Sequence, residues 1–444
     1  MVALAASVVL APLAVQAESL GDALASAYKN SGLLEQNRAN LRATDEGVAQ
    51  ALANLRPSIG YSASTGYNSA TKAWSEQLAF NASMTLYTFG RNKIALDIAK
   101  ETVLATRASL VNVEQQVLSD AISAYMNVRE QQSLVSLRES AVRLATQNLR
   151  ASQDRFEVGE VTRTVVSQFE AQLASARAQL SVAQGGLASA RESYKNIIGH
   201  YPVSLSQPPS VRLPASSADA AVNIARQNHP ALKALQHRVA ATDLGVEVAE
   251  RGQLPTLGAD ASVSIDGDGD STSSIGLGLS GPIYQGGAIA SAIREAVAQR
   301  DAARAELLTT ARDVEEAVRA NWAMLSVVSA SEQASQALVK AQRVAYDGVR
   351  EEADLGASTT LDVLDAEQDL LDAQVSAIQA TIARESQAYA VLQSMGLLTV
   401  EHLKLDVPVY DPAAYYNAVK DGPTRYVSPE GEKLDRVLEA LGRK

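Results

Sequence analysis

Two short stretches, 197 positions apart, decide the fold of this chain. VGEVTRTVVSQFEAQLASA occupies Val158–Ala176, and LGASTTLDVLDAEQDLLDA occupies Leu355–Ala373. Each has an apolar residue, a glycine, two variable residues and a threonine, followed by an Ala-rich helical pattern. Glycine can adopt the left-handed backbone that ends a helix, and threonine can cap the next one. Each stretch is therefore predicted to be the tip of a helical hairpin, built twice in one chain.

The repeat extends over most of the sequence. Residues 23–60 match 221–258 at an offset of 198, and the offset becomes 197 from Tyr87 and Tyr284 onward. Such self-similarity predicts one supersecondary unit built twice. The predicted organisation is a signal peptide at 1–17, a first repeat at 18–199, a Pro-rich linker at 200–216, a second repeat at 217–402 and a C-terminal segment at 403–444.

Each repeat is predicted to contain a helix, two strands, a very long helix, the tip turn and a shorter helix. The first helix is expected over about 19–55 and 217–253. Apolar residues then alternate at the period of a strand, as from Leu78 to Leu86 and from Leu257 to Ile265. No proline interrupts the following stretch, and a helix over 91–155 would be about 100 Å long. The fold class is α+β.

Composition excludes several classes of protein. The 444 residues carry a formal net charge of −11, which offers no basic stripe to nucleic acid. Cysteine is absent, so the chain has no disulfide, no thiolate metal site and no lipid-modified N-terminal cysteine. Apolar residues make up 46% but aromatic residues only 5%, because alanine supplies much of the apolar content. Small side chains of this kind suit long, closely packed helices.

The N-terminus is predicted to direct export. An apolar run ends in Val15-Gln16-Ala17, a small-x-small pattern typical of signal-peptide cleavage after Ala17. No Lys or Arg precedes the run, so the natural start could lie upstream, and a short buried helix is the alternative interpretation. No other run reaches the roughly 18–20 apolar residues that a membrane-spanning helix needs.

The four predicted strands are too few to close a β-barrel by themselves. Their length and alternation are typical of outer-membrane strands, yet about eight strands are needed to close the smallest barrel. Open strand edges in lipid leave backbone groups unpaired, at several kcal/mol each. Either several chains share one barrel, with the long helices extending from it as a tube, or the protein is an exported structural coiled-coil protein with two β-hairpins.

The sequence resembles the TolC-type outer-membrane efflux and export channels, in their unlipidated branch. The resemblance covers residues 20–400. It is strongest in the second hairpin stretch, and it also includes LYTFGRNKIALDIAKE from Leu86 and the duplicated LRPSIG and QLPTLG. It implies a homotrimer whose chains share a twelve-stranded β-barrel in the Gram-negative outer membrane, with a periplasmic α-barrel of helical hairpins. The implied function is a passive exit duct for a tripartite efflux pump or type I secretion system. Residues 403–444 are expected to contribute to an equatorial belt.

An acidic row follows the second tip. Asp362, Asp365, Asp369 and Asp372 are spaced by three, four and three residues, which places them on one helical face. Such a row is usually a solvated face. The resemblance implies that Asp362 and Asp365 occupy the constriction of the channel, with Asp369 and Asp372 as further acidic lining.

The gate of this chain departs from the family pattern. The polar latch of the family commonly uses an Asp, an Arg and a Tyr, at positions held here by Val165, Ser358 and Ala353. Arg163 is the nearest cation in the first tip, and it could pair instead with Asp362 or with Glu352.

The resemblance also implies partners. The two tips correspond to the docking site for a periplasmic adaptor, a membrane fusion protein that links the channel to an inner-membrane pump of RND, ABC or MFS type. A simple helix-breaking turn is the alternative interpretation. The tip residues are Val158, Gly159, Glu160, Leu355, Gly356 and Ala357.

Two further motifs are set aside. GLGLSG at 276–281 fits a dinucleotide-binding pattern but lies within an alternating strand. DGDGD at 266–270 resembles the start of a calcium loop, but Leu277 stands where that loop needs its Glu. We find no nucleophile–base set and no histidine cluster with metal-ligand spacing. The chain is therefore predicted not to be an enzyme and to need no cofactor or metal.

Overall fold

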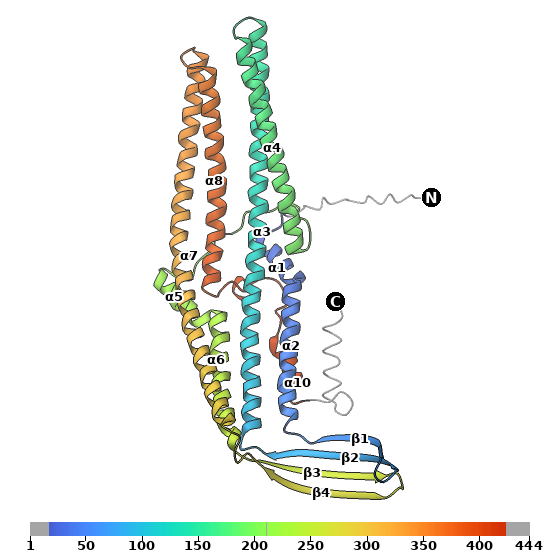
Figure 1. Ribbon diagram of the computed structural model, residues 1–444. Helices are drawn as coiled ribbons and strands as arrows, with labels where there is room; N and C mark the ends of the chain where they lie inside the picture. The colour runs from blue at the N-terminus through green and yellow to red at the C-terminus, as the bar shows by residue number, and fades with distance from the viewer. Residues whose placement is uncertain (1–16, 210, 423–444) are drawn as a thin grey trace, which may run out of the picture. The chain divides into compact units, whose positions relative to one another are not determined.

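The computed structural model describes residues 17–209 and 211–422 (Figure 1). The predicted signal peptide, apart from Ala17, and the end of the C-terminal segment at 423–444 lie outside the described residues. The first repeat comprises α1 (Leu20–Asn30), α2 (Gly32–Ala53), β1 (Ser58–Asn68), β2 (Ala73–Tyr87), α3 (Arg91–Glu157) and α4 (Arg163–Ile198).

The second repeat has the same order of elements. It comprises α5 (Ala218–Asn228), α6 (Pro230–Glu250), the 3₁₀ turn η1 (Arg251–Gln253), β3 (Thr256–Asp266), β4 (Ser271–Ser280), α7 (Ala288–Asp354) and α8 (Thr360–Ser394). Two short helices follow it, α9 (Val400–Leu403) and α10 (Pro412–Val419). At 67 residues each, α3 and α7 are the predicted very long helices.

The first helix of each repeat was predicted as one piece, and this is wrong. Ser31 has extended backbone (ψ 110°), which separates α1 from α2. His229 also has extended backbone and separates α5 from α6, and Pro230 is the first residue of α6. Proline has no N–H to continue a helix and fits its first turn. The imidazole of His229 accepts a hydrogen bond from the Ala231 N–H, 3.3 Å away, and burial lowers the pKa of this histidine.

The four strands form one antiparallel sheet in sequence order, β1-β2-β3-β4 (Figure 1). The register pairs Tyr61 with Phe80 and Phe80 with Val263, so these side chains lie on the same face. Ala261 continues the same face to Ile275 on β4. Cross-strand partners share a face, and successive residues of one strand alternate between the two faces. These pairs therefore assign every residue of the sheet to one face or the other.

One face of the sheet is apolar and the other is polar. The apolar face is also exposed: Ile59 retains 81% of its accessible surface, Trp74 71% and Ile275 89%. The ring centroids of Tyr67 and Trp74 are 5.5 Å apart beside the β1–β2 turn. The opposite face carries serine, glycine, asparagine, threonine and Asp260, as the pairs Ser58–Ser83, Gly60–Asn81 and Asp260–Gly276 illustrate. The sheet is therefore built to separate an apolar from an aqueous environment.

The chain divides into two compact units that cut across the repeats. Among the described residues, the first unit contains 17–31, 115–209, 211–221 and 318–408, and the second contains 32–114, 222–317 and 409–422. The first unit holds the tips, where α3 runs beside α4 and α7 beside α8 (Figure 1). The second unit holds the sheet and α10.

Small residues bring the helices of the first hairpin together. Ala145 on α3 packs with Leu173 and Ala176 on α4, with Val142 and Leu149 against them. Alanine at such positions lets two helices approach closely, which explains how a chain with few aromatic residues can bury its hairpins.

The linker is fixed to the start of the chain. Glu18 pairs with Leu205 in a parallel bridge, and the Tyr125 hydroxyl hydrogen-bonds the backbone oxygens of Glu18 and Ser206 at 3.0 and 2.7 Å. These bonds satisfy backbone groups that would otherwise be unpaired beside α3. Within 17–209 and 211–422, no helix is both long enough and apolar enough to cross a membrane.

Candidate functional site

Both tips have the same backbone geometry. Gly159 and Gly356 have φ of +77° and +78°, in the left-handed region that favours glycine. The Glu160 N–H donates to the Arg155 carbonyl at 2.9 Å, and the Ala357 N–H donates to Glu352 at 2.8 Å. These bonds reach back five residues and satisfy the last carbonyls of the ending helix. All six predicted tip residues are exposed within the chain.

The helices that leave the two tips begin differently. The Thr359 hydroxyl accepts from the Asp362 N–H, and the Asp362 carboxylate accepts from the Thr359 N–H at 2.8 Å and from its hydroxyl at 2.7 Å. Thr162 makes no such bond. The difference lies in the residue three positions after each threonine. The carboxylate of Asp362 can accept a hydrogen bond from the backbone of Thr359, whereas the apolar side chain of Val165 in the first repeat cannot accept one. Only the second tip therefore has a capping box.

The acidic row lies along the exposed face of α8. Asp362, Asp365, Asp369 and Asp372 are all exposed, whereas Leu364 between them is buried. Hydrogen bonds from Thr359 lower the pKa of Asp362 below its usual range. Asp362 is therefore negatively charged and also caps the N-terminus of α8. The assignment of Asp362 and Asp365 to a constriction stays a prediction.

The suggested pairing of Arg163 is not formed within one chain. Arg163 is exposed and makes no ion pair with another described residue, and the Glu352 carboxylate accepts instead from the Ser358 hydroxyl at 2.8 Å. The pairing of Arg163 with Asp362 or Glu352 as part of the gate stays a prediction.

A buried carboxylate lies five residues beyond Asp362 on α8. Glu367 on α8 keeps only 2% of its surface and accepts a hydrogen bond from Asn148 of α3 at 3.2 Å. Burial raises the pKa of Glu367, and the positive charge of Arg350 partly offsets this. At the equivalent position of the first repeat, Glu170 is exposed. The two glutamates occupy equivalent positions of the repeat, at an offset of 197, and sequence spacing carries no signal for their different surroundings.

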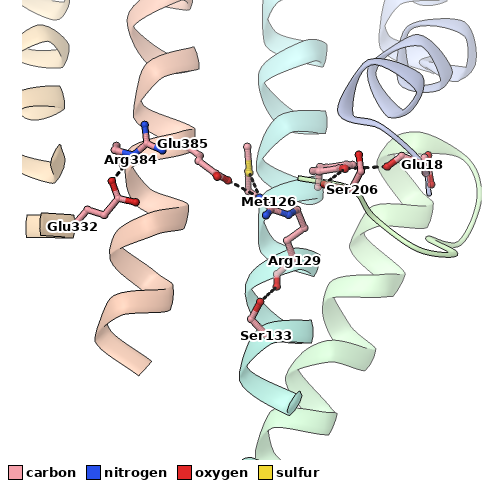
Figure 2. A network of polar contacts seen from close by, with 9 residues as sticks. Glu18, Met126, Arg129, Ser133, Ser206, Glu332, Arg384 and Glu385 are labelled. Carbon is pink, nitrogen blue, oxygen red and sulfur yellow. Dashed lines mark hydrogen bonds and ion pairs between the residues drawn. The ribbon is translucent and has the colours of Figure 1, made fainter. Parts of the chain in front are cut away.

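A charged network links the hairpins further along the first unit. Figure 2 shows Glu385 extending from α8 towards Arg129 of α3, with a nitrogen–oxygen distance of 2.5 Å. The two side chains are 8% and 18% exposed. The adjacent Arg384 pairs in turn with Glu332 of α7 at 2.5 Å (Figure 2). Because these side chains are largely buried, water could solvate only part of a charge that had lost its partner. Removing one member of a pair should therefore destabilise the other.

The polar contacts between α3 and α8 follow the two helices in antiparallel order. The Ser119 hydroxyl donates to Gln393 at 3.0 Å. Further along α3, Arg129 contacts Glu385 and Asn148 contacts Glu367. An exposed pair between Arg155 and Asp354, 3.3 Å apart, joins α3 to α7 near the tips. The two hairpins of one chain are therefore joined by specific polar contacts, which sequence spacing alone could not predict.

The second unit holds an Asp–Arg pair in each repeat. Asp45 of α2 lies 3.9 Å from Arg107 of α3, and Asp243 of α6 lies 2.8 Å from Arg304 of α7. Asp45 is fully buried, neither of its carboxylate oxygens has a hydrogen-bond partner among the described residues, and burial raises its pKa to about 6. The second pair is about half exposed.

Comparisons with known proteins agree with this architecture. The family model described as outer membrane efflux protein matches residues 23–200 and 221–397. The chain is 35% identical over 440 residues to outer membrane efflux protein BepC of Brucella suis, with 95% of each chain covered. It is 26% identical over 407 residues to outer membrane protein TolC of Vibrio cholerae, covering 87% of this chain and 92% of the relative.

A solved structure shows the same fold. The CmeC outer membrane channel of Campylobacter jejuni superposes with a TM-score of 0.76 at 17% identity, covering 91% of this chain and 90% of that one. At this level of identity, the likeness concerns the fold alone.

A duplicated chain with paired long hairpins and a two-faced sheet is the subunit of an outer-membrane channel. This chain belongs to the outer membrane efflux protein family, whose model matches both repeats. The resemblance to TolC-type channels and the α+β fold class are confirmed. The protein is an efflux channel of the outer membrane, and the alternative of an exported coiled-coil protein is not favoured.

Proposed function

We propose that three copies of this chain close one twelve-stranded barrel and act as the passive exit duct of a tripartite efflux pump or type I secretion system. The observation that carries this proposal is the sheet with one apolar and one polar face, whose outer strands β1 and β4 have no further strand beside them among the described residues. An apolar face suits lipid and a polar face suits an aqueous lumen, but free edges in lipid leave backbone groups unpaired. Three copies give twelve strands, and pairing β4 of one copy with β1 of the next removes every edge.

The helical hairpins would continue the duct into the periplasm. Threefold symmetry would bring three copies each of Asp362 and Asp365 around one axis, with Asp369 and Asp372 further from the tip. Their exposure within one chain supports this role, because no described segment of the same chain covers them. Close carboxylates repel one another and favour bound cations. Packing and a contact of Arg163 with a neighbouring copy would hold the neck closed.

The tips would dock a periplasmic adaptor, which would connect the channel to an inner-membrane pump. Val158 and Leu355 support this role, since they retain 71% and 86% of their surface at the ends of the hairpins. Exposed apolar residues at a regular turn are suited to burial by a partner. The pump would select the cargo, and residues 1–17 would be removed on export.

The test is the assembly of the purified channel in detergent. Native mass spectrometry should give three copies of the mature chain, and the trimer should conduct ions in a planar bilayer. As a matched pair, Ile275→Asp on the apolar face should prevent assembly, whereas Ser274→Asp on the polar face should leave a conducting trimer, because only the first places a charge in lipid. A stable monomer that keeps its full strand content would contradict the proposal.

A further inference from the structure

The last described residues of the chain lie against the first repeat. Residues 410–422, which include α10, are called the C-terminal cover. Two of its side chains, Tyr410 and Tyr416, pack against an apolar cluster of α2 and α3 that consists of Leu41, Val48 and Val103. The Arg56 guanidinium holds the end of the cover, since it donates to the Gly422 carbonyl at 2.7 Å. The cover is therefore fixed both by apolar packing and by a polar contact at its end.

The same two tyrosines stack on cations of the first repeat. The Tyr410 ring lies 4.9 Å from the guanidinium of Arg38 on α2, and the Tyr416 ring lies 4.8 Å from that of Arg107 on α3. A guanidinium over an aromatic ring is attracted by the negative face of the ring. The seating of the cover therefore depends on where the charges of α2 and α3 are held.

Asp45 lies on the α2 face that carries the apolar cluster. Leu41 precedes it by four residues and Val48 follows it by three, which is the spacing of one helical face. Asp45 is fully buried, and Arg107 is 3.9 Å away. Neither carboxylate oxygen, nor Nε and Nη2 of Arg107, has a hydrogen-bond partner among the described residues. Burial without hydrogen bonds disfavours the ionised carboxylate, and protonation removes that cost.

The equivalent carboxylate of the second repeat is not enclosed. Asp243 of α6 pairs with Arg304 at 2.8 Å, and both side chains are about half exposed. Gln236 stands where Arg38 binds Tyr410 in the first repeat, so this anchor for a covering tyrosine is missing. The same Asp–Arg pair is thus solvated in one repeat and buried in the repeat that carries the cover.

The charged and titratable groups that act on Asp45 or on the tyrosines above it come from three segments. They are Arg107 of α3, Arg42 and Glu46 of α2, and Tyr410 and Tyr415 of the cover. Burial raises the pKa of Asp45 to about 6, which Arg107 opposes and Glu46 reinforces. Burial also raises the pKa of Tyr410, and the charge of Asp45 adds to this rise. The carboxylate is therefore within electrostatic reach of the cover.

We propose that the proton on Asp45 controls the seating of the C-terminal cover, which is seated while Asp45 is neutral and loosens when Asp45 is ionised. An ionised Asp45 is stabilised by water, and it attracts Arg107 away from the Tyr416 ring. A neutral Asp45 leaves Arg107 to the ring. Since loosening gives Asp45 access to water, its pKa then returns towards the ordinary value. Protons therefore favour the seated cover, and this preference is lost as the pH rises through about 6. All these contacts lie within one chain, so the seating does not require the trimer.

Hydrogen exchange of the α10 amides tests this coupling in the intact protein in detergent. Exchange is measured by mass spectrometry and corrected for its intrinsic dependence on pH, so that the remaining protection reports how often the cover opens. From pH 5 to pH 7 the protection should fall about tenfold, as expected for a carboxyl whose pKa is about 6 when seated and 3.8 when solvated. Asp45→Asn and Asp45→Leu, two neutral variants of different shape, should both abolish the fall.

Two control variants locate the effect at Asp45. Asp243→Asn changes the equivalent carboxyl of the second repeat and should leave the fall at its original size. His237→Gln should also leave it unchanged; this histidine is itself ionisable, and it contacts Glu101 of α3 at 2.8 Å. Equal protection at both pH values, a fall that persists in the neutral variants of Asp45, or a fall abolished by either control would overturn the proposal.

Discussion

The pair of Arg129 and Glu385 is the clearest point at which to test how the hairpins are joined. The prediction concerns three variants: Glu385→Leu, Arg129→Met, and the two changes together. Each single change leaves one charge without its partner in a region where both side chains are largely covered, at 18% and 8% exposure. The double change leaves no charge and keeps apolar side chains of similar length.

The expected magnitudes follow from this partial burial. Removing one member of a fully buried pair costs about 3–5 kcal/mol. Arg129 retains some access to water, so each single variant should lose about 2–3 kcal/mol of unfolding free energy. The double variant should lie within about 1 kcal/mol of the parent, because an apolar pair avoids the cost of burying charge. The coupling energy of the cycle should therefore be about 2 kcal/mol or more.

The assay is equilibrium unfolding of the helical circular-dichroism signal in guanidinium, with reversibility checked for each variant. The control is the exposed pair of Arg155 and Asp354, whose side chains are 55% and 58% exposed. Removing either of these residues should cost less than about 1 kcal/mol, since exposed pairs contribute little. A coupling energy at Arg129 and Glu385 no greater than that of the exposed pair would refute the reasoning.

Three further predictions follow. Changing both Asp362 and Asp365 to Asn keeps an oxygen for the capping bond but removes the charge, so block of single-channel current by multivalent cations should weaken greatly; equal block would remove both residues from the constriction. A Cβ added at Gly159 or Gly356 would meet no neighbouring atom of the same chain within 4 Å, so within the chain valine at either position should act through the left-handed backbone, at about 1–2 kcal/mol, while its side chain would obstruct a docked adaptor. Either variant should lower export and leave trimer insertion intact, and normal export by both would exclude the tips as docking surfaces. The pKa of Asp45 is raised from 3.8 to about 6, so its contribution to stability is present at low pH and lost as pH rises through 6. Going from pH 7 to 5 should add about 1 kcal/mol of unfolding free energy, and Asp45→Asn should remove that gain; an unchanged pH profile in the variant would show that the carboxyl does not titrate in this range.

Local patterns explain why much of the fold could be predicted. The glycine and threonine of each tip require only the backbone preferences of neighbouring residues, and both tips have the predicted left-handed glycine. The alternation in β2 and β3 likewise predicted which side chains share the apolar face, because that face follows from the period of two. The break at Ser31 was missed, since serine is tolerated within helices and is a weak signal for ending one. Pro230 was a stronger signal for the break between α5 and α6.

The sequence by itself determined the duplication, the order of elements and the family, because these depend on residues close together along the chain or on identities that recur at a fixed offset. Only the tertiary structure decided how equivalent residues differ. Glu170 is exposed, whereas Glu367 is buried against α3. Asp45 of α2 is fully buried, whereas Asp243 at the equivalent position of α6 remains partly open. The same residue type at equivalent positions has a different electrostatic environment, because burial depends on which distant segment covers it, and no local pattern records that segment.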